Sequence, residues 1–307
     1  MEAVRGEYEK SEQYEKIGEG LGSGKTDKDL SAGFAEQVLE KYEILEKIGQ
    51  GTQGSVFRAR RKSDDVIVAI KQLPIGSVTT WKEYELFQRE VAVLSELNLD
   101  GVAKFYEAIE CLEGERPAAY VVQEFIEGRT LDVMMKSGYR FSLTRSFELI
   151  LQLIDILEQL HHHDPPIIHR DIKPSNIIMR PAQGDGFDLF LIDFGAVANP
   201  QVQSGGSTVA GTYGYMPPEQ LMGRPTVESD IYALGALCVH LLTGLAPVDL
   251  PIKDFHLVFE PYMQNMPVSV VNTIRAMLDP SIEKRLCDYN KLRFIFDAFY
   301  HSKFDIE

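Results

Sequence analysis

Two stretches in the second half of the 307-residue sequence place acidic, basic and amide side chains beside apolar runs. "IIHRDIKPSNIIM" contains Asp171, Lys173 and Asn176, and "LFLIDFG" contains Asp193. Asp171 can accept a proton from an incoming hydroxyl, and Lys173 can lie beside a transferred phosphoryl group. Carboxylate and amide oxygens suit magnesium, so Asn176 and Asp193 are the candidate metal ligands. The set predicts phosphoryl transfer, because this reaction needs positioning and charge neutralisation more than covalent chemistry from the protein.

The glycine-rich stretch "GEGLGSGKT", which ends at Thr26, does not fit a phosphate-binding P-loop. Glu19 stands where that motif needs its first glycine, and a carboxylate there would repel phosphates. No apolar strand precedes the stretch, and no strong helical pattern follows it. The stretch is more typical of a linker.

A second glycine-rich stretch, "KIGQGTQGSVF", has the pattern G-x-G-x-x-G-x-V. It contains Gly49, Gly51 and Gly54, followed by Val56. Strand-like residues flank it on both sides, which does not fit the strand-to-helix turn of a dinucleotide-binding fold. Glycines at these points let a hairpin lie flat over a polyphosphate, because no side chain blocks the backbone amides.

The stretch "VAIK" ends in Lys71, a cation in a strongly apolar expected strand. Its ammonium could reach phosphates beneath the glycine hairpin. A lysine in such surroundings needs a partner, and Glu90 in "LFQREVAVL" is the best candidate for an ion pair. The alternative is a solvated lysine and a glutamate on a helix surface.

These residues must be positioned by a sheet-rich first part and a mainly helical second part. Alternating apolar residues predict strands, and a 3.6-residue period predicts helices. The expected strands cover residues 42–49, 54–61, 66–73, 101–110 and 118–125, and the expected helices cover residues 81–97, 143–160, 230–242 and 268–278. Residues 1–40 are polar and acidic, so we expect a partly disordered extension that serves as a tether, a docking arm or an inhibitory segment.

Composition excludes several classes of protein. The formal net charge of -15 disfavours a nucleic-acid binder. No run approaches the ~18 apolar residues of a membrane span, and no secretory signal is evident, so we expect a cytoplasmic protein.

Cys111, Cys238 and Cys287 are too far apart in sequence for a zinc or disulfide framework. Residues 161–163 are all histidines, and they fall at an expected helix C-terminus. The helix dipole favours imidazole side chains there, so the run does not indicate a metal site.

In their order along the chain, these motifs resemble the signature set of the eukaryotic-type serine/threonine protein kinases, and "PPIIHRDIKPSNII" is similar to bacterial, especially cyanobacterial, members. The resemblance spans about residues 42–300 and is carried by Gly49-x-Gly51-x-x-Gly54-x-Val56, Val68-Ala69-Ile70-Lys71, His169-Arg170-Asp171, Asn176 and Asp193-Phe194-Gly195. It implies an α+β bilobal fold. Residues 41–126 would form a small lobe, with an antiparallel sheet and one main helix, and the hinge; residues 127–307 would form a larger, mostly helical lobe.

The resemblance also implies ATP and Mg²⁺ as cofactors, with Mn²⁺ as an alternative metal. The implied catalytic residues are Lys71, Glu90, Asp171, Lys173, Asn176 and Asp193, of which Asn176 and Asp193 would hold the metal. The implied ATP-binding residues are Ile48, Gly49, Gly51, Gly54, Val56, Ala69, Lys71, Glu124, Ile126 and Ile178, with the backbone of Glu124 and Ile126 facing adenine. Glu219 and Arg285 are implied to form a buried structural ion pair, and Asp230 to brace the catalytic loop from below.

The implied activity is transfer to serine and threonine hydroxyls of protein substrates, since Lys173 and the Gly-Thr pair at Thr212 are typical of that specificity. Autophosphorylation is expected at Ser204, Ser207 or Thr208. Two alternatives stay open. A pseudokinase scaffold would keep the fold without transferring phosphate, and a small-molecule phosphotransferase would use a similar catalytic loop. The sequence carries no signal for the oligomeric state.

Overall fold

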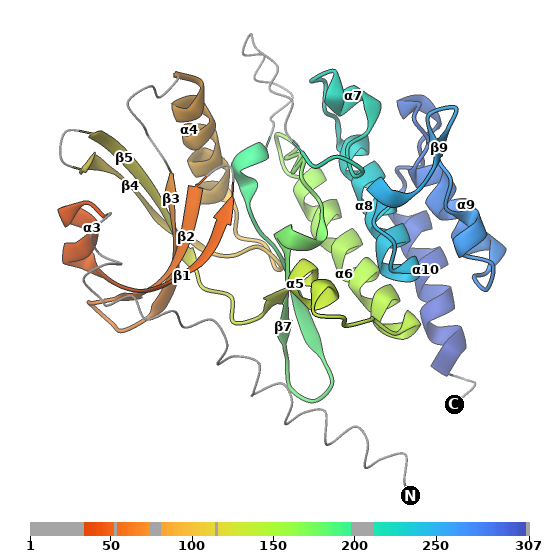
Figure 1. The fold of residues 1–307 in the computed structure, drawn as a ribbon, viewed down its shortest axis with the longest axis horizontal. Helices are drawn as coiled ribbons and strands as arrows, with labels where there is room; N and C mark the ends of the chain where they lie inside the picture. The colour runs from red at the N-terminus through yellow and green to blue at the C-terminus, as the bar shows by residue number, and fades with distance from the viewer. Residues whose placement is uncertain (1–33, 52–53, 74–80, 114–115, 198–210, 305–307) are drawn as a thin grey trace, which may run out of the picture.

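In a computed structural model, the protein folds into two lobes (Figure 1). The structure describes residues 34–51, 54–73, 81–113, 116–197 and 211–304. The small lobe contains a five-stranded sheet and the helix α4 (Trp81–Glu96), and the large lobe is mostly helical. The predicted α+β, two-lobed fold is confirmed.

The small-lobe sheet is antiparallel, with the strand order β1-β2-β3-β5-β4. Its strands are β1 (Tyr42–Gly51), β2 (Gly54–Arg61), β3 (Ile67–Leu73), β4 (Phe105–Glu113) and β5 (Arg116–Glu124). Strand β4 begins later than the predicted residue 101, because Gly101 lies in a turn with a φ of 79°. The register pairs Val56 with Lys71 and Phe57 with Ile70, which fixes the glycine hairpin relative to the lysine.

The two faces of this sheet have different partners, because successive side chains of a strand point to opposite faces. On one face, apolar side chains of all five strands form a single buried cluster, which includes Tyr42, Ile44, Phe57, Ala59, Val68, Ile70, Ile109, Tyr120 and Val122. We call this face the outer face. On the opposite face, Ala119 and Val121 of β5 belong to the same core as Phe87 and Leu94 of α4.

The short helix α3 (Glu36–Lys41) covers the outer face (Figure 1). Phe34, Ala35 and Val38 are buried there within the outer-face cluster. The predicted extension of residues 1–40 therefore includes residues that complete the core of the small lobe. Their apolar spacing is too short for a helix prediction, and the sheet that buries them is distant in sequence.

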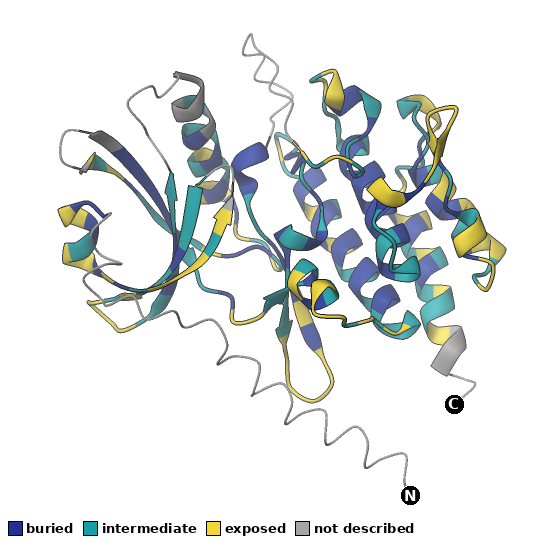
Figure 2. Cartoon of the chain, viewed as in Figure 1, coloured by how far each residue is buried: buried dark blue, intermediate teal, exposed yellow. Residues whose placement is uncertain are grey.

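The large lobe is built around α6 (Leu143–His161) and α8 (Val227–Thr243). The other helices are α5 (Leu131–Lys136), α7 (Pro218–Leu221), α9 (Val268–Met277) and α10 (Tyr289–Phe304). Ser142 accepts a hydrogen bond from the amide of Arg145 at the start of α6, and Gly244, with a φ of 73°, ends α8. The apolar residues of these two helices face the core, so that one side of α6 and nearly all of α8 are buried (Figure 2).

Short elements between these helices carry the polar motifs. The antiparallel sheet β6-β7-β8 consists of β6 (Arg129–Thr130), β7 (Ile177–Pro181) and β8 (Phe187–Leu191). The turns η1 (Pro174–Asn176) and η2 (Phe194–Ala196) lie next to β7 and β8 in sequence. Further along are η3 (Pro247–Asp249), the hairpin of β9 (Ile252–Lys253) and β10 (His256–Leu257), η4 (Glu260–Tyr262) and η5 (Ile282–Lys284). None of the described helices is long and apolar enough to cross a membrane.

Candidate active site

Lys71 joins the two lobes through its ammonium group. Nζ lies 2.8 Å from Oε1 of Glu90 on α4 and 2.8 Å from Oδ1 of Asp193, which follows β8 in the large lobe. Glu90 is buried, with a side chain only 2% exposed. The predicted Lys71–Glu90 ion pair is therefore present, and Asp193 completes it.

Within this trio, the ammonium of Lys71 and the carboxylate of Asp193 stabilise each other's charge, whereas burial and the charge of Asp193 raise the pKa of Glu90. Burial alone would lower the pKa of Lys71, but the carboxylates of Glu90 and Asp193 outweigh it and raise the pKa. Burial alone would raise the pKa of Asp193, but the ammonium of Lys71 holds that pKa below its ordinary value. Lys71 therefore stays cationic and Asp193 anionic at neutral pH, as a site for phosphate and metal requires.

Asp171 lies in a second polar cluster, formed by the loop before β7 and the segment after residue 210. Its Oδ2 is 2.7 Å from Nζ of Lys173 and accepts a hydrogen bond from Nδ2 of Asn176 at 2.9 Å. Its Oδ1 accepts a hydrogen bond of 2.9 Å from the hydroxyl of Thr212, which itself accepts one from Lys173 at 2.7 Å. Three side chains, the farthest of them 41 positions from Asp171 in sequence, thus hold its carboxylate in place.

Asp230, fully buried at the start of α8, holds the backbone beneath this cluster. Its two oxygens accept hydrogen bonds from the amides of His169 and Arg170, at 2.7 and 2.8 Å. A carboxylate in the first turn of a helix is favoured by the helix dipole. The predicted brace is confirmed. It stabilises Arg170 in the left-handed region, at a φ of 69°, directly before Asp171.

One further residue contacts this brace, a second contacts that residue, and neither was predicted. His161, at the end of α6, lies with Nε2 3.0 Å from Oδ2 of Asp230, and its Nδ1 contacts the hydroxyl of Tyr289 on α10. From the sequence, His161 was expected only to lie at a helix C-terminus. Its position four residues after Leu157, on the buried side of α6, is the signal that could have identified it as a core residue.

The imidazole of His169 is held in one tautomer by two backbone groups. Nδ1 accepts a hydrogen bond from the amide of Asp171 at 3.3 Å, so the proton lies on Nε2, which donates to the carbonyl of Ile192 at 3.1 Å. The ring packs edge-on against Phe194 with centroids 4.9 Å apart. His169 thus connects the segment of Asp171 to that of Asp193.

The glycine hairpin is joined to the site by the pairing of β2 with β3. A Cβ atom on Gly54, whose φ is 131°, would lie 2.1 Å from the carbonyl oxygen of Gln72. Glycine is therefore required here by close approach to β3, in addition to the predicted approach to phosphates. Gly49 and Gly51 pair with Val56 and Gly54 in β1 and β2, while the tip residues 52–53 lie outside the described part of the chain.

The predicted adenine-binding residues leave apolar surface and a backbone donor available. Ile48 is 45% exposed, although it is a large apolar side chain in a strand. Val56, Ala69 and Ile178 are each half-buried. The amide of Ile126, a buried residue, donates to no other residue that the structure describes. The amide of Glu124 instead donates to the carbonyl of Lys104 at 2.8 Å.

The candidate metal ligands are oxygen donors of the right kind. Asn176 uses Nδ2 for the carbonyl and carboxylate of Asp171, and its Oδ1 makes no hydrogen bond within the described residues. Asp193 is held anionic by Lys71. An amide oxygen and a carboxylate fit a hard divalent cation such as Mg²⁺.

The predicted pair of Glu219 and Arg285 is present and buried. Nη1 and Nη2 of Arg285 lie 2.5 and 3.1 Å from the two oxygens of Glu219, in bidentate geometry. Ser229 of α8 donates to the same carboxylate at 2.8 Å. The pair ties α7 to the segment before α10, which fixes the polypeptide that carries Thr212.

Comparison with known proteins gives the same assignment. Residues 42–291 match the protein kinase domain family. The chain is 34% identical over 264 residues to the serine/threonine-protein kinase PknA of Nostoc sp., covering 80% of this chain and 44% of that protein. It is 39% identical over 224 residues to serine/threonine-protein kinase C of Synechocystis sp., covering 67% and 40%. The Aurora kinase of Saccharomyces cerevisiae is 29% identical over 225 residues, covering 72% and 58%.

The chain therefore spans less than half the length of these two bacterial relatives. The match nevertheless extends from β1 into α10 and includes every residue of the clusters around Lys71, Asp171 and Asp230. Since the family match covers most of the chain and the motifs converge in space, the chain belongs to the protein kinase domain family.

Proposed function

We propose that the protein is an ATP-dependent serine/threonine kinase, which transfers the γ-phosphoryl group of Mg-ATP to serine and threonine hydroxyls of protein substrates. The observation that carries the proposal is the position of Lys71, whose ammonium contacts Glu90 of one lobe and Asp193 of the other. An assembled lysine, helix glutamate and metal-binding aspartate is the arrangement that phosphoryl transfer requires in protein kinases.

Nucleotide binding is supported by the surfaces left available around the hinge. Ile48, Val56 and Ala69 would cover one side of the adenine ring, and Ile178 the other, which removes a flat apolar ring from water. The amide of Ile126 would donate to the ring edge. Lys71 would neutralise phosphate oxygens beneath the glycine hairpin, at the point where β2 and β3 pair.

The residues around Asp171 would position the acceptor. The carboxylate of Asp171 would orient the acceptor hydroxyl and take its proton, while Lys173 would neutralise charge on the moving phosphoryl group. Asn176 Oδ1 and the carboxylate of Asp193 would hold the magnesium, which when bound supplies positive charge to the phosphate oxygens. The hydroxyl of Thr212 already contacts Asp171 at 2.9 Å, which supports an acceptor of the same chemical type.

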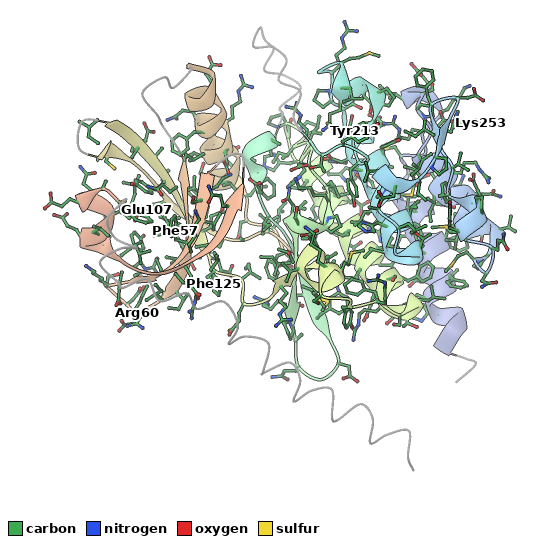
Figure 3. All side chains as sticks on the ribbon, viewed as in Figure 1. Phe57, Arg60, Glu107, Phe125, Tyr213 and Lys253 are labelled. Carbon is green, nitrogen blue, oxygen red and sulfur yellow. The ribbon has the colours of Figure 1, made fainter. Side chains whose placement is uncertain are left out.

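Serine and threonine specificity is supported further by the two bacterial relatives, both of which are named serine/threonine-protein kinases. Protein substrates would bind along the segment that follows residue 210. Tyr213, labelled in Figure 3, is 67% exposed on this segment, next to Thr212. An exposed aromatic beside the acceptor position is suited to contact with a polypeptide.

Autophosphorylation at Ser204, Ser207 or Thr208 is part of the proposal, and these residues lie outside the described residues. It is supported by the surroundings of Arg170. Burial lowers the pKa of its guanidinium; the charge of Asp230 opposes that change, and the like charge of Arg89 on α4 adds to it. A phosphate near two such cations would relieve their repulsion and order the segment that carries it.

The test is transfer of labelled phosphate from ATP to a basic test protein and, separately, to small alcohols. We expect transfer to the protein only, with a turnover on the order of 1 to 100 per second. Asp171→Asn and Lys71→Met should fold and lose about a hundredfold or more in turnover. Equal activity in wild type and both variants would contradict the assigned roles, and transfer to alcohols alone would favour a small-molecule phosphotransferase.

The same incubation tests autophosphorylation. Mass spectrometry should find phosphate on Ser204, Ser207 or Thr208 in the wild type and none in Asp171→Asn. Wild-type protein that transfers phosphate to the test protein while these three residues stay unmodified would remove this part of the proposal.

A further inference from the structure

The segment of residues 34–41 makes a dense set of apolar contacts with the outer face of the small-lobe sheet. The ring of Phe34 lies edge-on to Phe57 of β2, with centroids 4.7 Å apart, and stacks on Tyr120 of β5 at 5.7 Å. The amide of Ala35 donates to the hydroxyl of Tyr120 at 3.1 Å. Val38 is fully buried. Phe34 is thus inserted between two strands that are not neighbours in the sheet.

Polar contacts fix the other end of the segment. Lys41 forms an ion pair of 2.7 Å with Glu107 of β4, which also accepts a hydrogen bond of 2.7 Å from the hydroxyl of Tyr42. The ammonium of Lys62, just after β2, donates to the carbonyl of Leu39 at 2.6 Å. Figure 3 shows Phe57 and Glu107 on the side of the sheet that α3 covers. The segment therefore contacts β2, β4 and β5 together.

The strand residues that contact or surround this segment alternate with residues of the proposed nucleotide site. Phe57 directly follows Val56 in β2. Its cross-strand partner Ile70, fully buried in the outer-face cluster, stands between Ala69 and Lys71 in β3. Because the side-chain period of a strand is two, packing on one face fixes the backbone from which the other face projects.

From this arrangement we infer that residues 34–41 are a positioning element for the nucleotide site, with Phe34 as its central residue. The inference rests on the proposed function and adds a role for residues outside the kinase motifs. Without the Phe34 ring, β2 and β5 lose their common contact on the outer face, and close packing would be restored by movement of the strands. Val56 and Lys71 would move with their strands, so the nucleotide would bind less tightly.

The experiment measures the dissociation constant of a nonhydrolysable ATP analogue with Mg²⁺ by calorimetry, on the full chain, well below the unfolding temperature of each variant. Phe34→Ala should weaken binding about fivefold or more, and Phe34→Leu, which keeps apolar volume, should restore most of the affinity. In transfer assays, the KM for ATP should rise in Phe34→Ala while kcat stays within about twofold of wild type.

Two controls separate positioning from general stability. Gln37→Ala changes an exposed residue of the same helix and should bind like wild type. Val270→Ala removes methyl groups from the core of the large lobe, where Val270 is fully buried, and should lower the unfolding temperature without weakening nucleotide binding. If Val270→Ala weakens binding as much as Phe34→Ala does, the effect is general stability and the inference is wrong.

The outcomes also separate this inference from the proposed function. A wild-type chain that binds no nucleotide would contradict the proposed function. A wild-type chain that binds nucleotide, together with a folded Phe34→Ala variant of equal affinity, would overturn only the role of residues 34–41. Should Phe34→Ala fail to fold, Tyr120→Phe removes only the hydroxyl that accepts from Ala35. It should weaken binding about twofold, and unchanged affinity there would overturn the inference.

Discussion

His169 is a buried imidazole between two backbone partners, the amide of Asp171 and the carbonyl of Ile192. Burial lowers its pKa, and the negative charges of Asp230, Asp171 and Asp193 oppose this without reversing it. The ring therefore stays neutral in the folded protein, which preserves the hydrogen bond from the amide of Asp171. At the residue scale, the catalytic loop depends on an uncharged histidine.

The lowered pKa predicts a dependence of stability on pH. An unfolded chain protonates this histidine as the pH falls through its ordinary value of 6.5, whereas the folded protein resists protonation. The unfolded state then binds more protons, so the free energy of unfolding should fall as the pH is lowered below 6.5. Urea unfolding at several pH values measures this. His240, whose pKa burial also lowers, contributes with the same sign.

The matched comparison is His169→Gln against His256→Ala, since His256 is exposed on β10. The slope of stability against pH should flatten in His169→Gln and stay as in wild type in His256→Ala. An unchanged slope in His169→Gln would mean that His169 is not held neutral by burial.

At this scale the motifs predicted which residues meet, because phosphoryl transfer restricts the residue types and their order. Lys71, Glu90 and Asp193 could be expected together on that basis. The contacts of His161 with Asp230 and Tyr289 could not, because they join α6, α8 and α10 through long-range packing. The spacing from Leu157 could have identified His161 as a buried residue, but it carries no signal for the partners that His161 contacts.

At the scale of elements, the pair of Glu219 and Arg285 joins α7 to the turn η5. Both side chains are almost fully buried, and Arg285 also lies over the ring of Tyr232 at 5.1 Å. Removing one partner would leave a buried charge without its counter-ion. Arg285→Ala should therefore lower the free energy of unfolding by about 3 to 5 kcal/mol, measured by urea denaturation.

The control is the exposed pair of Arg60 and Glu43, whose closest atoms are 3.4 Å apart. Arg60, labelled in Figure 3, lies at the edge of the small lobe. Because water screens both charges, Arg60→Ala should cost less than about 1 kcal/mol. Equal losses in the two variants would show that burial does not govern the strength of the Glu219–Arg285 pair.

Long elements in which apolar residues recur at a regular spacing were predicted well, and short elements were not. Helix α6 follows the expected residues 143–160 to within one position. Helix α8 begins at Val227, three residues before the expected start, because Ser229 accepts a hydrogen bond from the amide of Thr226 and starts the helix earlier. Helix α3 and the hairpin of β9 and β10 have too few residues for a period to be recognised.

At the scale of the whole molecule, the site exists only where the lobes meet. Lys71 and Asp193 are 122 positions apart, and their contact brings β3 of the small lobe to the end of β8 in the large lobe. A second link is the bridge between Val102 and Leu191, in which the amide of Leu191 donates to the carbonyl of Gly101 at 2.8 Å. No local pattern encodes such contacts, so their geometry could be derived only from the folded chain.

The central claim is that side chains from both lobes surround one nucleotide triphosphate. It is tested most directly by a crystal structure of the protein with a nonhydrolysable ATP analogue and Mg²⁺. We predict phosphate oxygens within hydrogen-bond distance of Nζ of Lys71, and a metal ion bound by Oδ1 of Asn176 and the carboxylate of Asp193. A nucleotide that binds away from Lys71 and Asp193, or no bound nucleotide at saturating concentration, would contradict the account.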